Sequence, residues 1–197
     1  PALVRLGVIL LLRAGLLSFG QGLYYLLGGY AVAFASRYFG NTDAIVNLAF
    51  GAILAAACGA ALGLFIARYR GIFFAMLTLA LGMIAYGIAL KVPVFGGTDG
   101  INVRPPTWLG YSPRTADLQL AMYIFTVVST TVLLVVADLI LKSRFGRYID
   151  AVHENEIRLE YLGLSVKWTI FVLYVWASVL GGAGGALAAM TARHVEP

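Results

Sequence analysis

The sequence has few charged residues and a single cysteine, and each shortage excludes a class of structure. Charged side chains make up 12% of the 197 residues, and apolar side chains make up 61%. Soluble domains typically carry about 25% charged residues, so we expect an integral membrane protein that crosses the bilayer several times. The single cysteine, Cys58, excludes an intrachain disulfide framework and any metal site built from several cysteines.

The chain also lacks the marks of a nucleotide-hydrolysing or nucleic-acid-binding protein. It has no GxxxxGK(S/T) motif, so no cofactor and no site of ATP hydrolysis are expected in this chain. The net charge is +5, but the basic residues occur in ones and twos, which is typical of the loops of a membrane protein and predicts no nucleic-acid partner. The sequence starts at Pro1 without a signal peptide and stops just after an apolar run, so we expect a truncated chain.

Four long apolar segments predict membrane-spanning helices. Each is close to the ~20 residues that cross about 30 Å of hydrocarbon, and none shows the strict alternation that is typical of a β-barrel. The four predicted spans are residues 44–66, 72–92, 118–141 and 168–190. The glycines of the last span, in GGAGGALAA, are expected to let helices approach one another closely.

The first 36 residues predict an interrupted helix, because they are too long for one span and short for two. The interruption falls at SFGQG, where Gly20 and Gly22 flank Gln21. We predict a helix over residues 3–18 and a second element, a half-helix, over residues 23–36. Such a break is tolerated within a membrane only where protein or water covers it. The expected fold is one all-α transmembrane bundle over residues 1–197, with a discontinuous N-terminal helix.

The lysines and arginines of the loops predict the orientation in the membrane. If the spans alternate, the loop after residue 66 and the segment 142–167 lie on the same side. That side carries Arg68, Arg70, Lys142, Arg144, Arg147, Arg158 and Lys167, whereas the opposite side carries Arg37, Lys91, Arg104, Arg114 and Arg193. The more basic side is predicted to be cytoplasmic, and the Gly- and Pro-rich loop 93–117 to be external and built of turns.

The stretch RFGRYIDAVHENEIRLEYLG, residues 144–163, is the most charged part of the chain. A zinc-binding helix would need a second histidine four residues after His153, and Ile157 occupies that position. A helix on an anionic lipid surface would carry mainly basic residues, yet the acidic residues here are Asp150, Glu154, Glu156 and Glu160. Both a metal site and a lipid anchor are therefore disfavoured.

The same stretch predicts a short amphipathic helix of about 15 residues. Ile149, Val152, Leu159 and Leu162 fall near one face, and Gly163 is a suitable residue to end the helix. A helix of mixed charge with an apolar edge suits a groove on another protein, and a solvated connecting helix without a partner is the alternative.

Segments along nearly the whole chain resemble the branched-chain amino acid ABC importer permeases of the LivM type. The family's cytoplasmic loop reads approximately S-R-x-G-R-x-x-x-A-I-R-x-N-E-x-A-A-E-x-L-G. The matching residues are Ser143, Arg144, Gly146, Arg147, Ala151, Asn155, Glu156, Glu160, Leu162 and Gly163. The segments GLLSFGQG, FFAMLTLALGMI, GGTDGI and GGAGGALAA resemble four further family motifs, in the family's order. Arg13, Arg158, Leu159 and Tyr161 depart from the pattern.

The resemblance implies a transport subunit rather than an enzyme. In the family, the cytoplasmic loop forms a coupling helix that docks into a cytoplasmic ATPase, whose closure switches the permease between outward- and inward-facing states. The residues expected to face the ATPase are Val152, Asn155, Glu156, Leu159, Glu160 and Gly163. The expected substrates are branched-chain amino acids, with urea or short amides as alternatives known in the superfamily.

The resemblance also implies partners and a location. These are a second, LivH-like permease subunit, two ATPase subunits that bind ATP and Mg, an external solute-binding protein, and the lipid of the bacterial cytoplasmic (inner) membrane. An ATP-independent channel or carrier is the rival interpretation. It predicts acidic residues within the membrane for ion coupling, and the clear spans carry none except Asp138 near an end.

Four residues are candidates for the translocation path. Ser18, Gly20 and Gln21 offer exposed backbone and an amide, which suit a polar zwitterionic solute. Arg13 is a charge within a predicted span, which is by default a functional hypothesis. The alternatives are a glycine contact between packed helices for the SFGQG break and, for Arg13, a position near the helix end from which its charge reaches water.

Overall fold

A computed structural model describes residues 2–38, 40, 43–92, 95–96, 100–108, 115–154, 156–161 and 163–195. The helices are α1 (Ala2–Arg13), α2 (Gln21–Tyr38), α3 (Ala44–Ile66), α4 (Gly71–Lys91), α5 (Thr115–Lys142), α6 (Arg144–Glu154), α7 (Glu156–Tyr161) and α8 (Val166–Ala192), and the strands are β1 (Ile101–Asn102) and β2 (His194–Val195). The fold is an almost entirely helical bundle, as predicted. In the described part of the chain, α3, α4, α5 and α8 are each long and apolar enough to cross a membrane.

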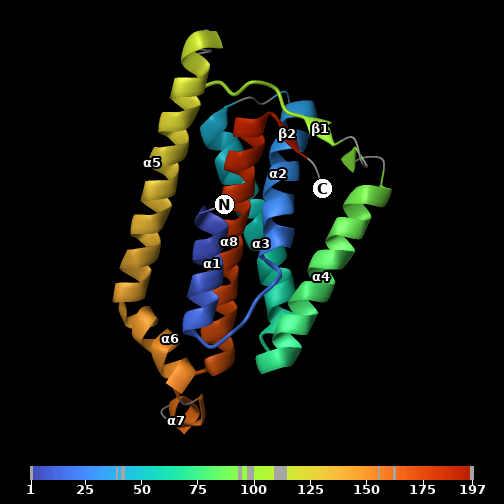
Figure 1. The fold of residues 1–197 in the computed structure, drawn as a ribbon. Coiled ribbons are helices and arrows are strands. Elements are labelled where there is room, and N and C mark those ends of the chain that lie inside the picture. Colours follow the sequence, from blue (N-terminus) through green and yellow to red (C-terminus); the bar gives the residue numbers. More distant parts are fainter. Residues whose placement is uncertain are drawn as a thin grey trace.

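Helix α8 lies at the centre of the bundle, between α1, α2 and α3, while α4 and α5 run along its outside (Figure 1). Of the most apolar 18 consecutive residues in each helix, 72% are buried in α8, 17% in α4 and 6% in α5. The other helices therefore assemble around α8, and α4 and α5 offer most of their apolar surface to lipid or to other chains.

Small residues let the backbones of α2, α3 and α8 meet. A Cβ atom added at Gly28 would collide with the carbonyl oxygen of Gly182, and one added at Gly185 would collide with that of Tyr25. A Cβ at Gly182 itself would collide with Ala55 of α3. The predicted role of the α8 glycines in close helix packing is confirmed.

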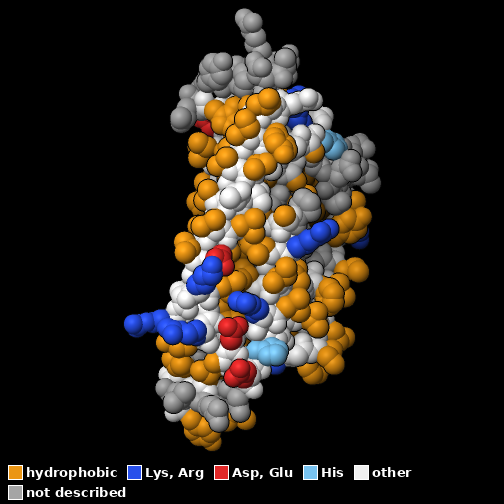
Figure 2. All heavy atoms as spheres, turned by 60° about the vertical axis from the view of Figure 1, so that its left-hand side comes forward, with side chains coloured by type: hydrophobic (Ala, Val, Ile, Leu, Met, Phe, Trp, Pro, Cys, Tyr) orange, Lys and Arg blue, Asp and Glu red, His pale blue; other side chains and the backbone are white. Residues whose placement is uncertain are grey.

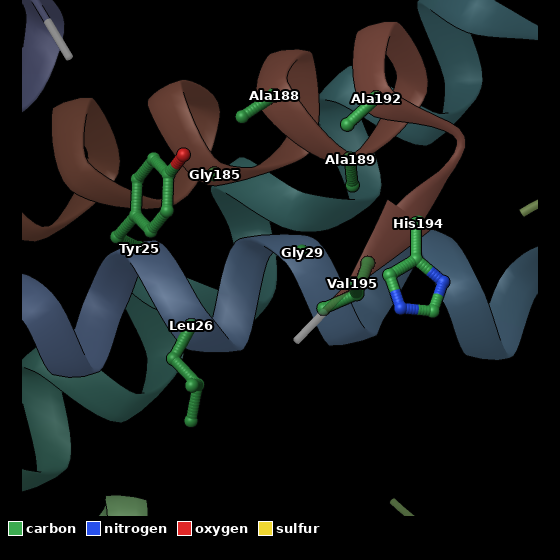
Figure 3. A pocket seen from close by; sticks show the side chains of 9 residues that line it. All are labelled: Tyr25, Leu26, Gly29, Gly185, Ala188, Ala189, Ala192, His194 and Val195. Atoms are coloured by element: carbon green, nitrogen blue, oxygen red, sulfur yellow. The ribbon is translucent and has the colours of Figure 1, made fainter. Parts of the chain in front are cut away.

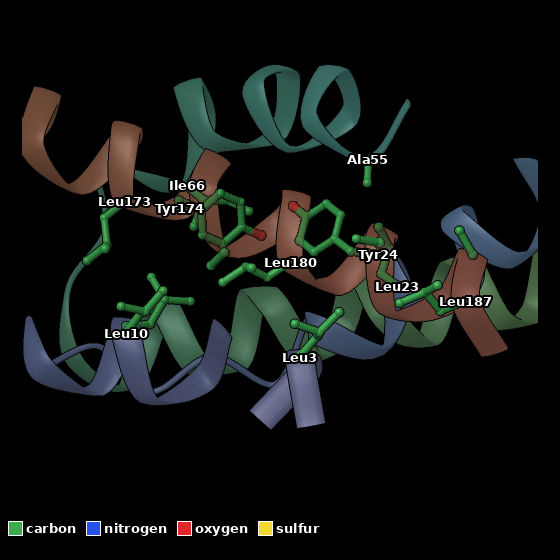
Figure 4. Packing of buried hydrophobic residues seen from close by; sticks show 14 of the residues in the cluster. Leu3, Leu10, Leu23, Tyr24, Ala55, Ile66, Leu173, Tyr174, Leu180 and Leu187 are labelled. Carbon is green, nitrogen blue, oxygen red and sulfur yellow. The ribbon is translucent and has the colours of Figure 1, made fainter. Parts of the chain in front are cut away.

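Large side chains fill the core toward the other end of these helices (Figure 4). The rings of Tyr24 and Tyr174 meet edge to face with centroids 5.8 Å apart, and Phe74 meets Tyr174 in the same way at 5.9 Å. Such aromatic pairs contribute about 0.5–1.5 kcal/mol beyond the burial of their area. They join α4, otherwise peripheral, to the α2–α8 core.

The helix predicted over residues 3–18 is wrong over residues 14–18, because α1 ends at Arg13. Gly15 has a φ of 73° and donates its N–H to Leu12 O at 2.9 Å, and Leu16 N–H donates to Leu11 O at 3.0 Å. This pair of bonds is the Schellman arrangement, in which a left-handed residue ends a helix. The second element is also longer than predicted, since α2 is a continuous helix of 18 residues that starts at Gln21.

A small antiparallel pairing, which the turn prediction for residues 93–117 did not include, ties one end of the bundle together. Ile101 pairs with Val195 and Asn102 with His194. Beyond the pairing, Arg104 N–H donates to Ser36 Oγ at 3.2 Å. The ends of α2 and α8 are thus joined through β1, while α6 and α7 lie at the opposite end of the bundle (Figure 1).

The substitution Gly28→Ala tests the backbone contact between α2 and α8. The added methyl group must displace the backbone of Gly182, and overpacking of this kind costs about 1–3 kcal/mol. We expect a clearly lower thermal unfolding midpoint in a fixed detergent. Gly87→Ala is the matched control, because a Cβ at Gly87 meets nothing within 4 Å. Equal midpoints for the two variants would contradict the close contact.

Candidate functional site

The connection between α1 and α2 is a segment without helix that buries one of its two sides against the bundle. Leu16, Ser18 and Gly20 are buried, whereas the alternate residues Leu17 and Phe19 are exposed. This alternation follows from an extended backbone, whose successive side chains point to opposite sides. The interruption predicted at SFGQG is therefore present, and its inner face is covered by protein, as such a break requires.

Thr78 of α4 covers this segment from outside. Its side chain is fully buried, and its Oγ1 accepts a hydrogen bond from Phe19 N–H at 3.2 Å while donating to Ala75 O at 2.9 Å. Gly20 lies against the same residue, since a Cβ there would be 3.2 Å from Thr78 Cβ. Thr78 was not among the predicted site residues, although a hydroxyl within the apolar span FFAMLTLALGMI was an available signal.

Gln21, the first residue of α2, is the most polar group inside this site. Its side chain is 3% exposed, and neither Oε1 nor Nε2 has a hydrogen-bond partner in the described structure. The amide occupies space that two glycines leave free: a Cβ at Gly7 of α1 or Gly181 of α8 would lie 3.1 or 3.0 Å from Oε1. A buried amide without partners costs about 1–3 kcal/mol per unsatisfied group. This junction of α1, α2 and α8 is therefore suited to accept a polar partner.

Arg13 differs from the other three candidates for the path. It is exposed and is the last residue of α1, at the end of the bundle that holds α6 (Figure 1). A cation in the last turn of a helix is favoured by the helix dipole. Ser18, Gly20 and Gln21 are buried, so the structure groups these three and sets Arg13 apart. A role for any of them in transport stays a prediction.

The charged stretch forms two helices rather than the single one predicted. α6 has 11 residues and α7 has six, and Asn155 between them lies outside the described residues. α6 follows α5 through a tight turn at Ser143, whose Oγ donates to Ile140 O and accepts from Phe145 N–H at 3.2 Å. The turn fixes the direction of α6 relative to the long helix α5.

One side of α6 and α7 is packed into the bundle. Ile149, Val152 and Leu159 are at most 6% exposed and belong to the main hydrophobic core. This corrects the expectation that Val152 and Leu159 face an ATPase: the apolar edge is covered by the chain's own helices. α6 also reaches the α1–α2 connection, because the ring of His153 lies against Gly15, 2.9 Å from where a Cβ would be.

The exposed side of α6 carries the charges. Arg147, Asp150, His153 and Glu154 are exposed, and Figure 2 shows basic and acidic side chains gathered toward the α6 end below a mainly apolar surface. Gly163 is exposed, with a φ of 79°, and Leu164 N–H donates to Leu159 O at 3.1 Å, so its predicted role as a helix stop is confirmed. The side chains of Glu156 and Glu160, like Thr98 and Asp99 of GGTDG, lie outside the described residues.

A metal site finds no support in the described part of the chain. No group of three His, Cys, Asp or Glu side chains there could hold an ion. His153 lies against Gly15 rather than within a set of ligands. The buried junction around Gln21 and the charged side of α6 are the two candidate sites that the predicted residues form.

The comparisons with known proteins explain this combination. A family model described as "Branched-chain amino acid transport system / permease component" matches residues 2–197. The chain belongs to this permease family. Its α6–α7 region and its interrupted α1–α2 region are thus those of a multi-pass permease component.

Two curated relatives carry the same kind of description. The permease is 29% identical over 206 residues to the high-affinity branched-chain amino acid transport system permease protein LivM of Escherichia coli (strain K12). It is 28% identical over 211 residues to the protein of that name in Salmonella typhimurium. Each alignment covers 93% of this chain and 48% of the relative, so the chain spans about half the length of the curated relatives it matches. No solved structure gives a significant match.

Thr78→Val tests how α4 holds the interrupted segment. Valine keeps the shape but leaves the part-buried N–H of Phe19 without this acceptor, which costs about 0.5–1.5 kcal/mol. We expect a lower thermal unfolding midpoint and faster amide hydrogen exchange at residues 16–20. Thr131→Val on the exposed face of α5 is the control and should change neither. Unchanged exchange in the Thr78 variant would show that this bond does not hold the segment.

Proposed function

We propose that this chain forms the membrane domain of an ABC importer permease that carries branched-chain amino acids. The observation that carries the proposal is the match of residues 2–197 to a family described by that transport system. The helical bundle supports it, since four described helices are suited to cross a membrane. The importer would work in the bacterial cytoplasmic membrane with a second, LivH-like permease subunit and an external solute-binding protein.

ATP hydrolysis is assigned to two separate ATPase subunits, which would bind ATP and Mg. The exposed charges of α6, namely Arg147, Asp150 and Glu154, are the part of this chain that suits a protein partner. A force on these charged side chains would be transmitted to the helix bundle, because Ile149 and Val152 are packed in its core. Rigid packing of this kind transmits small movements of one element to its neighbours.

The path for the solute is assigned to the junction around Gln21. An amide offers both a donor and an acceptor, which match the carboxylate and the ammonium group of an amino acid. In the present conformation both groups are buried without partners, and Ser18 and Gly20 lie beside them in the chain. We infer that the helices around Gln21 separate during transport, so that the amide then contacts water or the solute.

Reconstitution of the full-length permease with its ATPase subunits and binding protein tests the function directly. We expect uptake of labelled leucine into proteoliposomes only when ATP is supplied. Uptake at the same rate without ATP would favour a channel or carrier, and uptake of urea or short amides instead of leucine would identify another substrate class. Either result would contradict the proposal.

The double variant Asp150→Lys, Glu154→Lys tests the assignment of α6. Reversal of two exposed charges at a protein interface should weaken binding of the ATPase by about 1–3 kcal/mol. We therefore expect ATPase capture and ATP-driven uptake to fall by tenfold or more. Asp138→Asn is the control, since Asp138 is exposed near the same end but pairs with Lys142 within α5. Normal capture by the double variant would refute docking through this side of α6.

Gln21→Met separates a transport role from a structural one. Methionine fills similar space without a buried polar group, so the protein should become more stable by roughly 1 kcal/mol. If the amide contacts the solute, uptake should fall at the same time. The exposed Gln119→Met is the matched control and should alter neither property. A more stable variant with normal uptake would remove Gln21 from the path.

A further inference from the structure

Three arginines gather where the C-terminal ends of α2 and α8 meet β1. Val103 N–H donates to Arg193 O at 2.9 Å, and Arg104 N–H donates to Ser36 Oγ at 3.2 Å. These bonds hold Arg193, Arg104 and Arg37 close along the backbone, and all three side chains are exposed. Asp43 is the acidic residue near this end among the described side chains, and it accepts a hydrogen bond from Thr107. Among the described side chains at this end, three cations, the cluster Arg37–Arg104–Arg193, thus face one acidic residue.

Arg193 occupies a backbone position where glycine would be easier to accommodate. Its φ of 56° and ψ of 18° are left-handed, and it is the one non-glycine residue with positive φ among those described. An L-residue is strained in this conformation, and such strain is retained mainly where the side chain has a use. The strained position turns the chain from α8 into β2 and keeps a guanidinium at the end of the bundle.

A narrow apolar groove runs below this cluster between α2 and α8 (Figure 3). It is lined by Leu26 and Gly29 of α2 and by Ala188 and Ala192 of α8, and its volume is about 130 Å³. Figure 3 shows His194 at one end of the groove and Tyr25 at the other. The end marked by His194 is next to Arg193 in the chain, so the groove leads away from the arginine cluster.

A second groove lies on the other side of the same part of α8. It runs between α5 and α8, has a volume of about 470 Å³, and is again lined by Ala188 and Ala192. Thr126 and Thr130 of α5 line it too, and the buried Thr126 hydroxyl has no hydrogen-bond partner in the described structure. Two apolar grooves thus flank one ridge of α8, directly before Arg193.

We propose that the two grooves hold the acyl chains of an anionic phospholipid whose phosphate binds the cluster Arg37–Arg104–Arg193. Each part of the lipid has a counterpart: guanidinium groups bind phosphate, apolar grooves suit acyl chains, and a hydroxyl such as that of Thr126 can donate to an ester carbonyl. A transmembrane helix of another protein would use the grooves but not the cations. The proposal does not depend on which solute is transported or on ATP.

Native mass spectrometry of the full-length permease in detergent provides the test, with phosphatidylglycerol and phosphatidylcholine of identical acyl chains as probes. We expect phosphatidylglycerol to be retained about tenfold better, because the trimethylammonium group of phosphatidylcholine offsets the charge of its phosphate and is repelled by the arginines, whereas phosphatidylglycerol keeps a net negative charge. Arg193→Gln should reduce this preference to near unity. Arg68→Gln, an exposed arginine at the opposite end of the bundle, is the matched control and should leave the preference intact.

Two further variants separate lipid binding from a structural role of the same residues. Arg193→Gly removes the backbone strain, so it should raise the unfolding midpoint without lipid and abolish the additional rise that phosphatidylglycerol causes. Ala188 lines both grooves, so Ala188→Phe should reduce the retention of both lipids alike. Equal retention of the two lipids by the wild type would overturn the proposal. Normal phosphatidylglycerol retention by Arg193→Gln, by Arg193→Gly or by Ala188→Phe would also overturn it. That result is the one expected if a protein segment covers the grooves.

Discussion

The direct contact of helix backbones around α8 is the constraint on which the rest of the structure depends. Within a bilayer, apolar side chains gain little from leaving lipid, so helices associate through close packing and hydrogen bonds. Gly28 on Gly182 and Gly185 on Tyr25 bring α2 within backbone contact of α8, and Ala55 does the same for α3. No large side chain fits at these positions, so this part of the bundle tolerates little change in spacing. Helices α4 and α5 lie further out, with little of their apolar surface buried.

This central contact also creates the polar site. Because Gly7 and Gly181 leave room between α1 and α8, the amide of Gln21 can enter a space that would otherwise hold two methyl groups. The interrupted segment before it forms no helix of its own, and the hydroxyl of Thr78 accepts a hydrogen bond from it on the outer side. The site is therefore assembled from a rigid side, formed by α8, and a more weakly held side, formed by the connection and α4. Such an arrangement suits a junction that opens and closes.

The sequence was informative where a signal is local. Apolar length located α3, α4, α5 and α8, and the SFGQG motif located the break. The residue at which the break begins was not predictable, because it depends on two details of the folded backbone. These are the left-handed conformation of Gly15 and the hydrogen bond from Leu16 N–H to Leu11 O. The burial of Val152 and Leu159 was not predictable, because an amphipathic pattern shows that a face is apolar without showing what covers it. Likewise, the pairing of residues 101–102 with 194–195 joins segments nearly a hundred positions apart, beyond any local pattern.

If α6 docks on an ATPase as proposed, the burial of its apolar edge lets it transmit force to the bundle better than an open amphipathic helix would. If Val152 and Leu159 were free to dock, a partner would bind α6 without necessarily moving the bundle. With these residues in the core, any force on the exposed charges must act through packed side chains. His153 adds a short route, since its ring lies on Gly15, where α1 ends and the segment leading to Gln21 begins. Only residues 16–20 therefore separate the contact of His153 on Gly15 from the buried amide of Gln21, with no intervening helix.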